Sequence, residues 1–265
     1  MNIDYNKISM RDSFISNLTN LMDKNNNIFF ITADFGSPAL DILRKKFPER
    51  FLNVGIAEQN LINISAGLAL EGFIVYAYSI APFITMRCLE QIRTNISILG
   101  TIKKLNINLI GVGAGVSYDI AGPSHHCLED LSIIRTLPNI EFFSPSDSYI
   151  TSKYTTETLK NNYPKYLRFD AIGLPSIYND QSDINFKDGF TIFNKKGRSC
   201  IISTGYMTHI AKNISNNYLS PKNITVIDMF LLKYFNKNKL FSILSNFENL
   251  IILQEGFKNT GGLDS

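Results

Sequence analysis

The chain has 265 residues, of which 26 are basic and 23 acidic, so its formal net charge is +3. This length allows one large domain or two moderate ones, and the balanced charge gives no support for binding nucleic acid or an anionic membrane. Hydrophobic residues make up 45% of the chain and charged residues 18%, which is typical of a globular protein with a sizeable core.

Helix-like and strand-like segments alternate from one end of the chain to the other. The first half predicts a helix at 8–23, a strand at 28–33, a helix at 57–71, a strand at 73–79, a helix at 83–99 and a strand at 106–112. The rest predicts a helix that begins near 126 and ends before Pro138, and strands at 140–144, 165–169, 200–205, 224–229 and 250–255. Such alternation indicates an α/β fold with a mainly parallel sheet flanked by helices.

A domain boundary is expected near 173–190, because this stretch is polar, contains glycine and proline and has no clear periodicity. We therefore expect a first domain over 1–175 and a smaller α/β domain over 188–265. The second domain has few elements for its kind and stops where another helix should begin, so we expect it to be truncated or to rely on a partner.

Neither a signal peptide nor a membrane span is expected. The N-terminal residues contain no apolar stretch, and polar residues interrupt the apolar run 61–86. The three cysteines, Cys88, Cys127 and Cys200, are far apart and form no C-x-x-C pair, which argues against a zinc site or a disulfide framework. Reduced thiols in a cytoplasmic protein are the simplest interpretation.

A glycine-rich stretch, "GVGAGVSYDIAGPSHHCLED" at 111–130, follows a predicted strand. It lacks the third glycine of the dinucleotide fingerprint, and the chain has no P-loop motif. His125 and His126 lie in it, and histidines suit polar contact or proton transfer near neutral pH. Helix capping by one histidine and solvation of the other remains an alternative, whereas the spacing of nearby acids matches no familiar metal site.

A single acid, Glu58, stands in "NVGIAEQN" at 53–60, a stretch that otherwise predicts a buried turn and helix. Burying a carboxylate is costly unless another group pairs with it. Glu58 is therefore either a functional acid or a helix N-terminal acid that the helix dipole stabilises.

Three stretches in this order resemble a known family: "DFGS" at 34–37, "NVGIAEQN" at 53–60 and "GPSHH" at 122–126. Together they are similar to the pyrimidine-binding half of transketolase-type thiamine-diphosphate enzymes. The resemblance covers almost the whole chain and implies a pyrimidine-binding domain followed by a transketolase C-terminal domain.

The resemblance implies a set of cofactor contacts. Glu58 matches the acid that hydrogen-bonds a ring nitrogen of the cofactor's aminopyrimidine, and so carries a catalytic role. Phe83 matches the aromatic residue that stacks on that ring, and Ile80 stands where many transketolases have a second aromatic residue. Asp34 matches an acid near the cofactor, although it is alternatively a capping residue after the first strand.

It also implies substrate contacts. His125 matches the histidine that contacts substrate hydroxyls, which makes it a second catalytic candidate, and His126 stands where transketolases usually have glutamine. Arg11 matches an arginine of the phosphate site, Arg168 lies near the position of another, and Asp119 in the glycine-rich loop is a further candidate.

Three departures from the family concern the substrate. Ala121 replaces an acid that reads a sugar hydroxyl, Gly113 replaces a second histidine, and Ala171 replaces a phosphate-gripping arginine. Losing one member of an anion clamp removes a charge-assisted contact. We therefore expect a sugar other than a standard pentose or hexose phosphate: an unphosphorylated, deoxy or nucleotide-linked one.

The family's diphosphate and Mg²⁺ are held by a domain marked by G-D-G, and no G-D-G occurs in this sequence. We expect an N-terminal-type partner subunit to supply the diphosphate site and the metal ligands, in an α2β2 assembly that acts on small sugars. Transfer of a two-carbon ketol unit is the leading function. The alternatives are the beta subunit of a 2-oxo-acid dehydrogenase, a deoxyxylulose-phosphate-synthase-like enzyme, and a non-catalytic subunit of the same fold.

Overall fold

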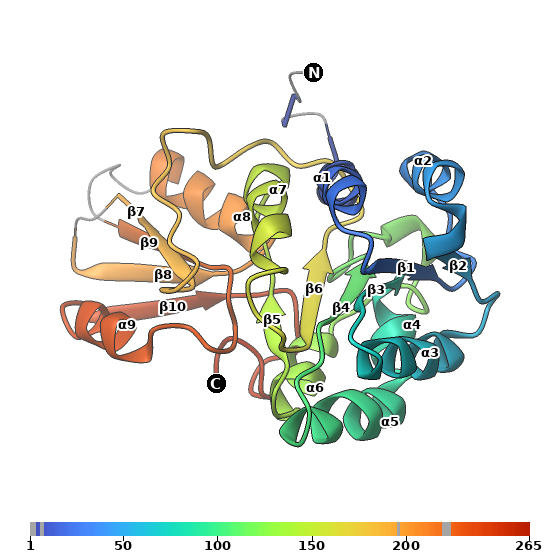
Figure 1. Cartoon of the computed structure of the whole chain (residues 1–265). Helices are drawn as coiled ribbons and strands as arrows, with labels where there is room; N and C mark the ends of the chain where they lie inside the picture. Colours follow the sequence, from blue (N-terminus) through green and yellow to red (C-terminus); the bar gives the residue numbers. More distant parts are fainter. Residues whose placement is uncertain (1–3, 6–7, 195–196, 219–223) are drawn as a thin grey trace.

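Figure 1 shows the computed structural model, which describes residues 4–5, 8–194, 197–218 and 224–265. Six of the described strands form a wholly parallel sheet in the order β2-β1-β3-β4-β6-β5. Their bounds are β1 (Ile28–Thr32), β2 (Phe51–Asn53), β3 (Ile74–Ile80), β4 (Ile107–Val112), β5 (Glu141–Phe143) and β6 (Lys165–Phe169). The predicted parallel α/β sheet is confirmed.

A second, smaller sheet lies beside the first (Figure 1). Its order is β10-β8-β9-β7, from β7 (Phe190–Phe193), β8 (Ser199–Ser203), β9 (Ile224–Met229) and β10 (Asn249–Leu253). Strands β8, β9 and β10 are parallel, whereas β7 runs antiparallel to β9. The smaller α/β unit predicted after the first sheet is therefore present, with one strand that the sequence pattern did not reveal.

Helices cover both faces of the large sheet (Figure 1). One face carries α1 (Met10–Lys24), α2 (Pro38–Lys46) and α7 (Ser148–Glu157); the other carries α3 (Glu58–Leu70), α4 (Ala81–Thr85), α5 (Leu89–Ile92) and α6 (Asp130–Thr136). Because side chains alternate along a strand, neighbouring residues enter different cores. Phe30 packs with the α1 side and Ile31 with the α3 side, and both are fully buried. The central strands are mostly apolar, as the sequence suggested, although β6 carries the buried Lys165 and Arg168.

The sequence pattern gave no residue range for several elements, because their apolar pattern is weak or short: α2, α7, α8 (Met207–Asn213), α9 (Lys237–Leu244), β2 and β7. Helix α7 is the clearest case. Its buried face includes Thr151 and Thr155, whose hydroxyls donate to the carbonyls four residues earlier, at 2.6 and 3.2 Å. Asp147 caps its first turn by accepting from the backbone of Ile150 at 2.9 Å.

The helix predicted over 83–99 is broken. Helix α4 ends at Thr85, a turn covers 86–88, and after α5 the chain continues as a π-helix (Arg93–Ile98) and a 3-10 turn (Leu99–Thr101). Thr85 Oγ1 donates to the carbonyl of Ala81 at 2.7 Å, a bond that bends helices locally. The helix predicted from about 126 begins at Asp130 instead.

Buried polar contacts join the two sheets. Asp228 of β9 is fully buried and accepts from Ser146 Oγ at 2.7 Å, Tyr178 OH at 2.8 Å and Thr208 Oγ1 at 2.8 Å. Burial raises the pKa of Asp228 to about 6. Backbone bonds add to this contact, since the amide of Leu232 donates to the carbonyl of Phe142 at 2.8 Å. The segment between β6 and β7, which contains the expected boundary, therefore connects two closely packed units.

All three cysteines are free and buried, and burial raises the pKa of Cys88 and of Cys200 to about 12. They are therefore poor nucleophiles, consistent with structural thiols. Among the described residues, no helix has the length and apolar character needed to cross a bilayer.

Candidate active site

The candidate residues gather where the parallel strands of the large sheet end. Asp34 follows β1, the segment to Glu58 follows β2, Phe83 follows β3, and the loop with His125 follows β4. The connection from β2 to β3 crosses to the other side of β1, so the order in which strands are added to the sheet reverses between β1 and β3. Ligands of open α/β sheets bind at the carboxyl ends of the strands beside such a reversal.

Glu58 is the first residue of α3, and its side chain is only 3% exposed. Gly55, with a positive φ of 75°, makes the turn that leads from β2 to this helix. Ala57 provides no side-chain cap, so the carboxylate is the acidic group in the first turn, where the helix dipole favours a negative charge. The structure shows that Glu58 is buried and lies at a helix N-terminus, where the helix dipole stabilises it; its role as a functional acid stays a prediction.

Glu58 is paired with Arg87, which lies in the turn between α4 and α5. Arg87 Nη1 donates to Glu58 Oε2 at 2.8 Å. The carbon of the same guanidinium lies 4.3 Å from the centre of the Phe83 ring, over its face. The sequence analysis missed Arg87, although a cation four residues after Phe83 is a signal that could have identified it.

An aromatic row continues from Phe83 into the loop after β4. The His125 ring packs edge-on against Phe83 with centroids 5.2 Å apart, and Tyr118 lies 6.3 Å from His125. Ser124 Oγ is 3.1 Å from His125 Nδ1. The structure thus brings Glu58, Phe83 and His125 into one site.

Asp34 is tied to the segment that leads to Glu58. Asn53 Nδ2 donates to Asp34 Oδ1 at 3.0 Å, and the backbone amides of Asp34 and Gly55 both donate to Asn53 Oδ1 at 3.0 Å. Asp34 is exposed and has a positive φ of 52°. Asn53 was not singled out by the sequence, although it opens the quoted motif. It fixes the ends of β1 and β2 relative to each other.

The loop after β4 is held closed by a pair of backbone hydrogen bonds. The amide of Gly115 donates to the carbonyl of Cys127 at 3.1 Å, and the amide of Cys127 donates back at 2.7 Å. Asp119 is exposed on a short 3-10 turn (Asp119–Ala121). Nε2 of His126 is buried and has no hydrogen-bond partner among the described residues.

Tyr118 covers Gly113 in this loop. A Cβ at Gly113 would lie 2.3 Å from two ring atoms of Tyr118, and Gly113 has a φ of 99°. The position where the family pattern has a histidine is therefore filled by the tyrosine ring. Burial raises the pKa of Tyr118, and Arg11 lies close enough to lower it in part.

We expect Gly113→Ala to destabilise the protein by roughly 2 kcal/mol, because the methyl group adds a clash with Tyr118 to the strain of a positive φ. Gly72→Ala is the matched control: Gly72 follows α3 with a φ of 93°, close to that of Gly113, but no atom lies within 4 Å of its added Cβ. It should cost about 1 kcal/mol, from backbone strain alone. Urea unfolding measures both, and equal losses would show that the Tyr118 ring moves aside freely.

Arg11 and Ile80 border the same edge of the sheet. Arg11, on α1, forms a two-point contact with Asp12, with Nε–Oδ1 and Nη2–Oδ2 distances of 2.8 and 3.2 Å. Ile80 is half-buried at the end of β3, immediately before α4. Arg11 thus lies near the loop with Tyr118, but its guanidinium is engaged by its neighbour.

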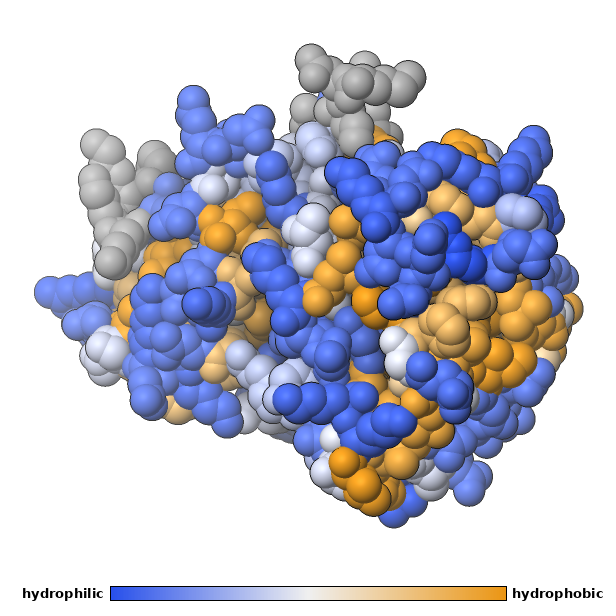
Figure 2. All heavy atoms as spheres, viewed as in Figure 1, coloured by the Kyte–Doolittle hydropathy of each residue, from blue (hydrophilic) through white to orange (hydrophobic). Residues whose placement is uncertain are grey.

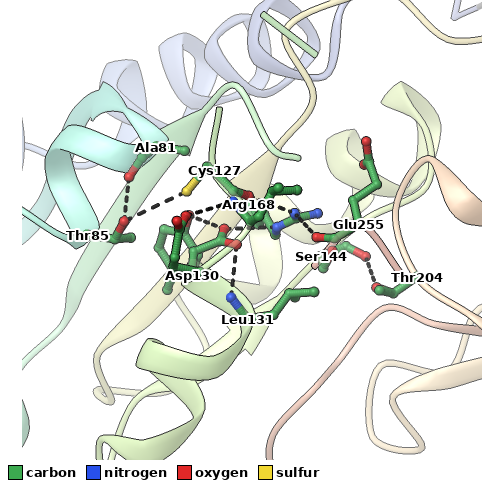
Figure 3. A network of polar contacts seen from close by, with 12 residues as sticks. Ala81, Thr85, Cys127, Asp130, Leu131, Ser144, Arg168, Thr204 and Glu255 are labelled. Atoms are coloured by element: carbon green, nitrogen blue, oxygen red, sulfur yellow. Dashed lines mark hydrogen bonds and ion pairs between the residues drawn. The ribbon is translucent and has the colours of Figure 1, made fainter. Parts of the chain in front are cut away.

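Arg168 does not lie where the substrate prediction needs it. It is almost completely buried, and its Nε donates to Asp130 Oδ2 at 2.9 Å while its Nη2 contacts the carbonyls of Glu255 at 3.2 Å and Cys127 at 3.4 Å (Figure 3). Because its guanidinium is buried and already hydrogen-bonded, Arg168 is not accessible to a sugar phosphate. Its role in this structure is to connect α6, the loop after β4 and the smaller domain.

Glu255 brings the smaller domain to the site, and no motif in the sequence pointed to it. Its Oε1 accepts from the backbone amide of Val116 at 3.4 Å, and a Cβ on Gly115 would lie 2.3 Å from its carboxyl carbon. Burial raises the pKa of Glu255, and the charge of Arg168 opposes this increase. The glycine-rich loop is thus packed against a carboxylate from the end of β10.

The model of the transketolase pyrimidine-binding domain matches residues 6–175. The chain belongs to the transketolase family. The matched range contains the whole large sheet and every predicted site residue. Membership in this family implies thiamine diphosphate as the cofactor.

Relatives of this transketolase-family chain include subunits of split enzymes. It is 30% identical over 256 residues to one subunit of the apulose-4-phosphate transketolase of Actinobacillus succinogenes, covering 95% of this chain and 79% of that protein. It is 27% identical to the 6-deoxy-6-sulfo-D-fructose transketolase subunit SqwH of a Clostridium species, covering 75% and 60%. In eight of the matched relatives, the aligned part spans between 37% and 79% of their lengths.

Among solved structures, the chain is similar to a split-gene transketolase described as an inactive beta4 tetramer. The identity is 29%, the TM-score is 0.82, and the match covers 97% of this chain and 83% of that one. The chain is therefore a transketolase-like transferase subunit of the C-terminal, split type, as the resemblance implied.

Proposed function

We propose that this chain supplies the pyrimidine-side half of a thiamine-diphosphate site in a two-subunit enzyme that transfers a two-carbon ketol unit between sugars. The observation that carries the proposal is Glu58, a carboxylate 3% exposed at the edge of a parallel sheet, beside the Phe83 ring and His125. An acid, an aromatic face and a histidine at the strand ends are what the resemblance requires.

The residues present fit the aminopyrimidine. Glu58 and Phe83 already hold a planar, nitrogen-bearing group between them, the guanidinium of Arg87, by a hydrogen bond of 2.8 Å and a stacking distance of 4.3 Å. An aminopyrimidine ring is also planar and also presents nitrogen atoms at its edge. Stacking on Phe83 and a hydrogen bond to the Glu58 carboxyl group therefore suit it, with the direction of that bond reversed, because a ring nitrogen accepts where the guanidinium donates. Asp34 and Ile80 lie at the border of the site.

Each of the candidate site residues then has a distinct role. Glu58 holds and moves a proton at a carboxyl oxygen facing the ring nitrogen, in a place from which water is largely excluded. Phe83 orients the ring, and His125 contacts a sugar hydroxyl, aided by His126 and Asp119 in the same loop. Arg11 contacts an anionic group of the sugar. The bound cofactor acts as an electron sink for the carbanion chemistry.

The diphosphate and Mg²⁺ belong on a partner in this proposal. Within the described part of the chain, no group of three or more His, Cys, Asp or Glu side chains could hold a metal ion. Large apolar residues are exposed in the segments that carry the site, with Ile56 79% and Ile120 98% exposed. Figure 2 shows apolar residues gathered around β2 and α3 on the face in view. A similar beta4 tetramer is described as inactive.

We therefore propose an N-terminal-type transketolase subunit as the partner, in an α2β2 assembly. The three free, buried cysteines fit a reducing compartment, and we propose the cytoplasm.

The proposed substrate is a non-standard ketose. Ala121 and Ala171 lack the side chains that read a hydroxyl and grip a phosphate in the family, and the Tyr118 ring fills the place above Gly113. The named substrates of two relatives, apulose 4-phosphate and 6-deoxy-6-sulfofructose, are also unusual sugars. A site without these two side chains disfavours the standard pentose and hexose phosphates.

Reconstitution tests the function. The chain is co-purified with a subunit that carries G-D-G, and ketol transfer is measured with and without thiamine diphosphate and Mg²⁺. We expect transfer only in the complete mixture, with lower efficiency for fructose 6-phosphate and xylulose 5-phosphate than for deoxy or branched ketoses. Ordinary efficiency with either standard sugar refutes the substrate proposal, and a complete mixture without any transfer refutes the activity.

Association with the partner should depend on Ile120. We expect Ile120→Asp to leave the melting temperature of the isolated chain within about 1 °C, because the side chain is almost fully exposed, and to weaken binding to the partner at least tenfold by placing a charge in an apolar contact. Ile102→Asp is the control. Ile102 is 84% exposed and precedes β4, so it lies toward the amino-terminal ends of the strands, whereas the candidate site lies at their carboxyl ends. Equal affinities for both variants would place the partner elsewhere.

A further inference from the structure

Arg87 contacts both Glu58 and the face of the Phe83 ring. Its Nη1 donates to Glu58 Oε2 at 2.8 Å, and its guanidinium carbon lies 4.3 Å over the centre of the Phe83 ring. Glu58 is 3% exposed and Arg87 is 45% exposed. A planar cation thus lies on the aromatic face while donating to the buried acid.

These are the two contacts that the proposed function assigns to the aminopyrimidine ring. Flat groups stack at about 3.5 Å, so a second ring between Arg87 and Phe83 needs a separation of roughly 7 Å. The separation in the structure is 4.3 Å. Arg87 and the aminopyrimidine therefore cannot occupy the Phe83 face and hydrogen-bond Glu58 Oε2 at the same time.

We propose that Arg87 is an internal placeholder for the aminopyrimidine: it pairs with Glu58 and stacks on Phe83 in the free subunit, and the cofactor must displace it. This inference rests on the proposed function. Arg87 should then have two effects: it makes the free subunit more stable, and it lowers the affinity of the enzyme for the cofactor.

The free subunit has a physical need for such a group. A carboxylate as buried as Glu58 is costly when it stands alone, and Arg87 is the cation that meets it in the described structure. The charge-assisted hydrogen bond and the cation–π contact hold the site in order before the cofactor arrives.

The contact is also easy to release. Nearly half of the Arg87 side chain is in water, so the guanidinium is already partly hydrated and need not cross the core to leave Glu58. Its backbone lies in the turn between α4 and α5, outside any helix, and is held by Gln59, whose Nε2 donates to the Arg87 carbonyl at 3.2 Å. The side chain can therefore swing out into solvent while the main chain and Phe83 remain in place.

Arg87→Met tests the inference, because methionine keeps an apolar stem but has neither charge nor a planar donor. Thiamine diphosphate is titrated calorimetrically into the complex of this chain with its partner subunit, at fixed Mg²⁺. We expect the dissociation constant to fall threefold to tenfold, since no ion pair has to break, and the isolated chain to melt at a lower temperature than the wild type. Arg87→Gln should change both quantities in the same direction.

Arg93→Met is the matched control, since Arg93 is an exposed arginine shortly after Arg87 in the chain. It should change neither quantity. Unchanged or weaker cofactor binding by both Arg87 variants overturns the placeholder inference while leaving the proposed function intact. A wild-type complex that does not bind thiamine diphosphate at all removes the proposed function, and this inference with it.

Discussion

The Glu58→Gln variant is expected to fold, to assemble with the partner and to lose turnover by about 100-fold or more, the usual contribution of an acid–base group. Glutamine preserves the size of the side chain and a carbonyl oxygen that can still accept from Arg87, which the carboxylate now does at 2.8 Å. It cannot, however, exchange a proton. The measurement is ketol transfer by the reconstituted enzyme, with assembly followed by size-exclusion chromatography.

Glu71→Gln provides the control for this variant. Glu71 is exposed at the opposite end of α3, where it follows the last helical residue. Its replacement makes the same chemical change at the other end of the same helix, away from the site, and should leave turnover within twofold. If Glu58→Gln turned over at the wild-type rate, the catalytic assignment would be wrong and the non-catalytic alternative would gain support.

The second large effect is expected from Asp130→Ala, at the buried ion pair with Arg168. The side chains of this pair are 0% and 1% exposed, and the carboxylate also accepts from Tyr166 OH at 2.8 Å and from the amide of Leu131 at 2.9 Å. Removing it leaves a guanidinium buried without its counter-ion, which typically costs about 3–5 kcal/mol. Urea unfolding of the isolated chain measures the loss.

Two further variants separate burial of charge from loss of packing. Glu248→Ala removes a partner from the exposed pair with Arg198, whose side chains are 61% and 83% exposed, and should cost less than about 1 kcal/mol. The double variant Asp130→Leu with Arg168→Met removes both buried charges and should recover much of the stability lost in Asp130→Ala. A loss below about 1 kcal/mol for Asp130→Ala would mean that water reaches Arg168.

The same pair explains why Arg168 is not available as a substrate ligand. In the sequence, an arginine at the end of a strand near a phosphate-site position is a reasonable candidate for that role. In the fold, that strand is β6. Asp130 of α6, the Cys127 carbonyl before that helix and the Glu255 carbonyl after β10 surround the guanidinium. These partners come from 38 to 87 residues away in the chain. No local pattern contains that information, because it depends on how the two domains pack.

The sequence by itself determined the parallel α/β architecture, because the strands inside a parallel sheet are short, mostly apolar runs, and β1, β3 and β4 are such runs. It also determined the family, through motifs whose residues are close in the chain. Glu58 could be singled out because a lone acid in an apolar context is chemically conspicuous.

Only the tertiary structure decided what surrounds each of these residues. The break after Thr85 that presents Arg87 to Glu58, the Tyr118 ring over Gly113, and Glu255 against the glycine-rich loop all depend on contacts between separate segments. Periodicity and motif spacing report which way a side chain faces within its own element. Which partner it meets there is fixed by packing between elements, and in this protein that packing fills the candidate site with the chain's own arginine.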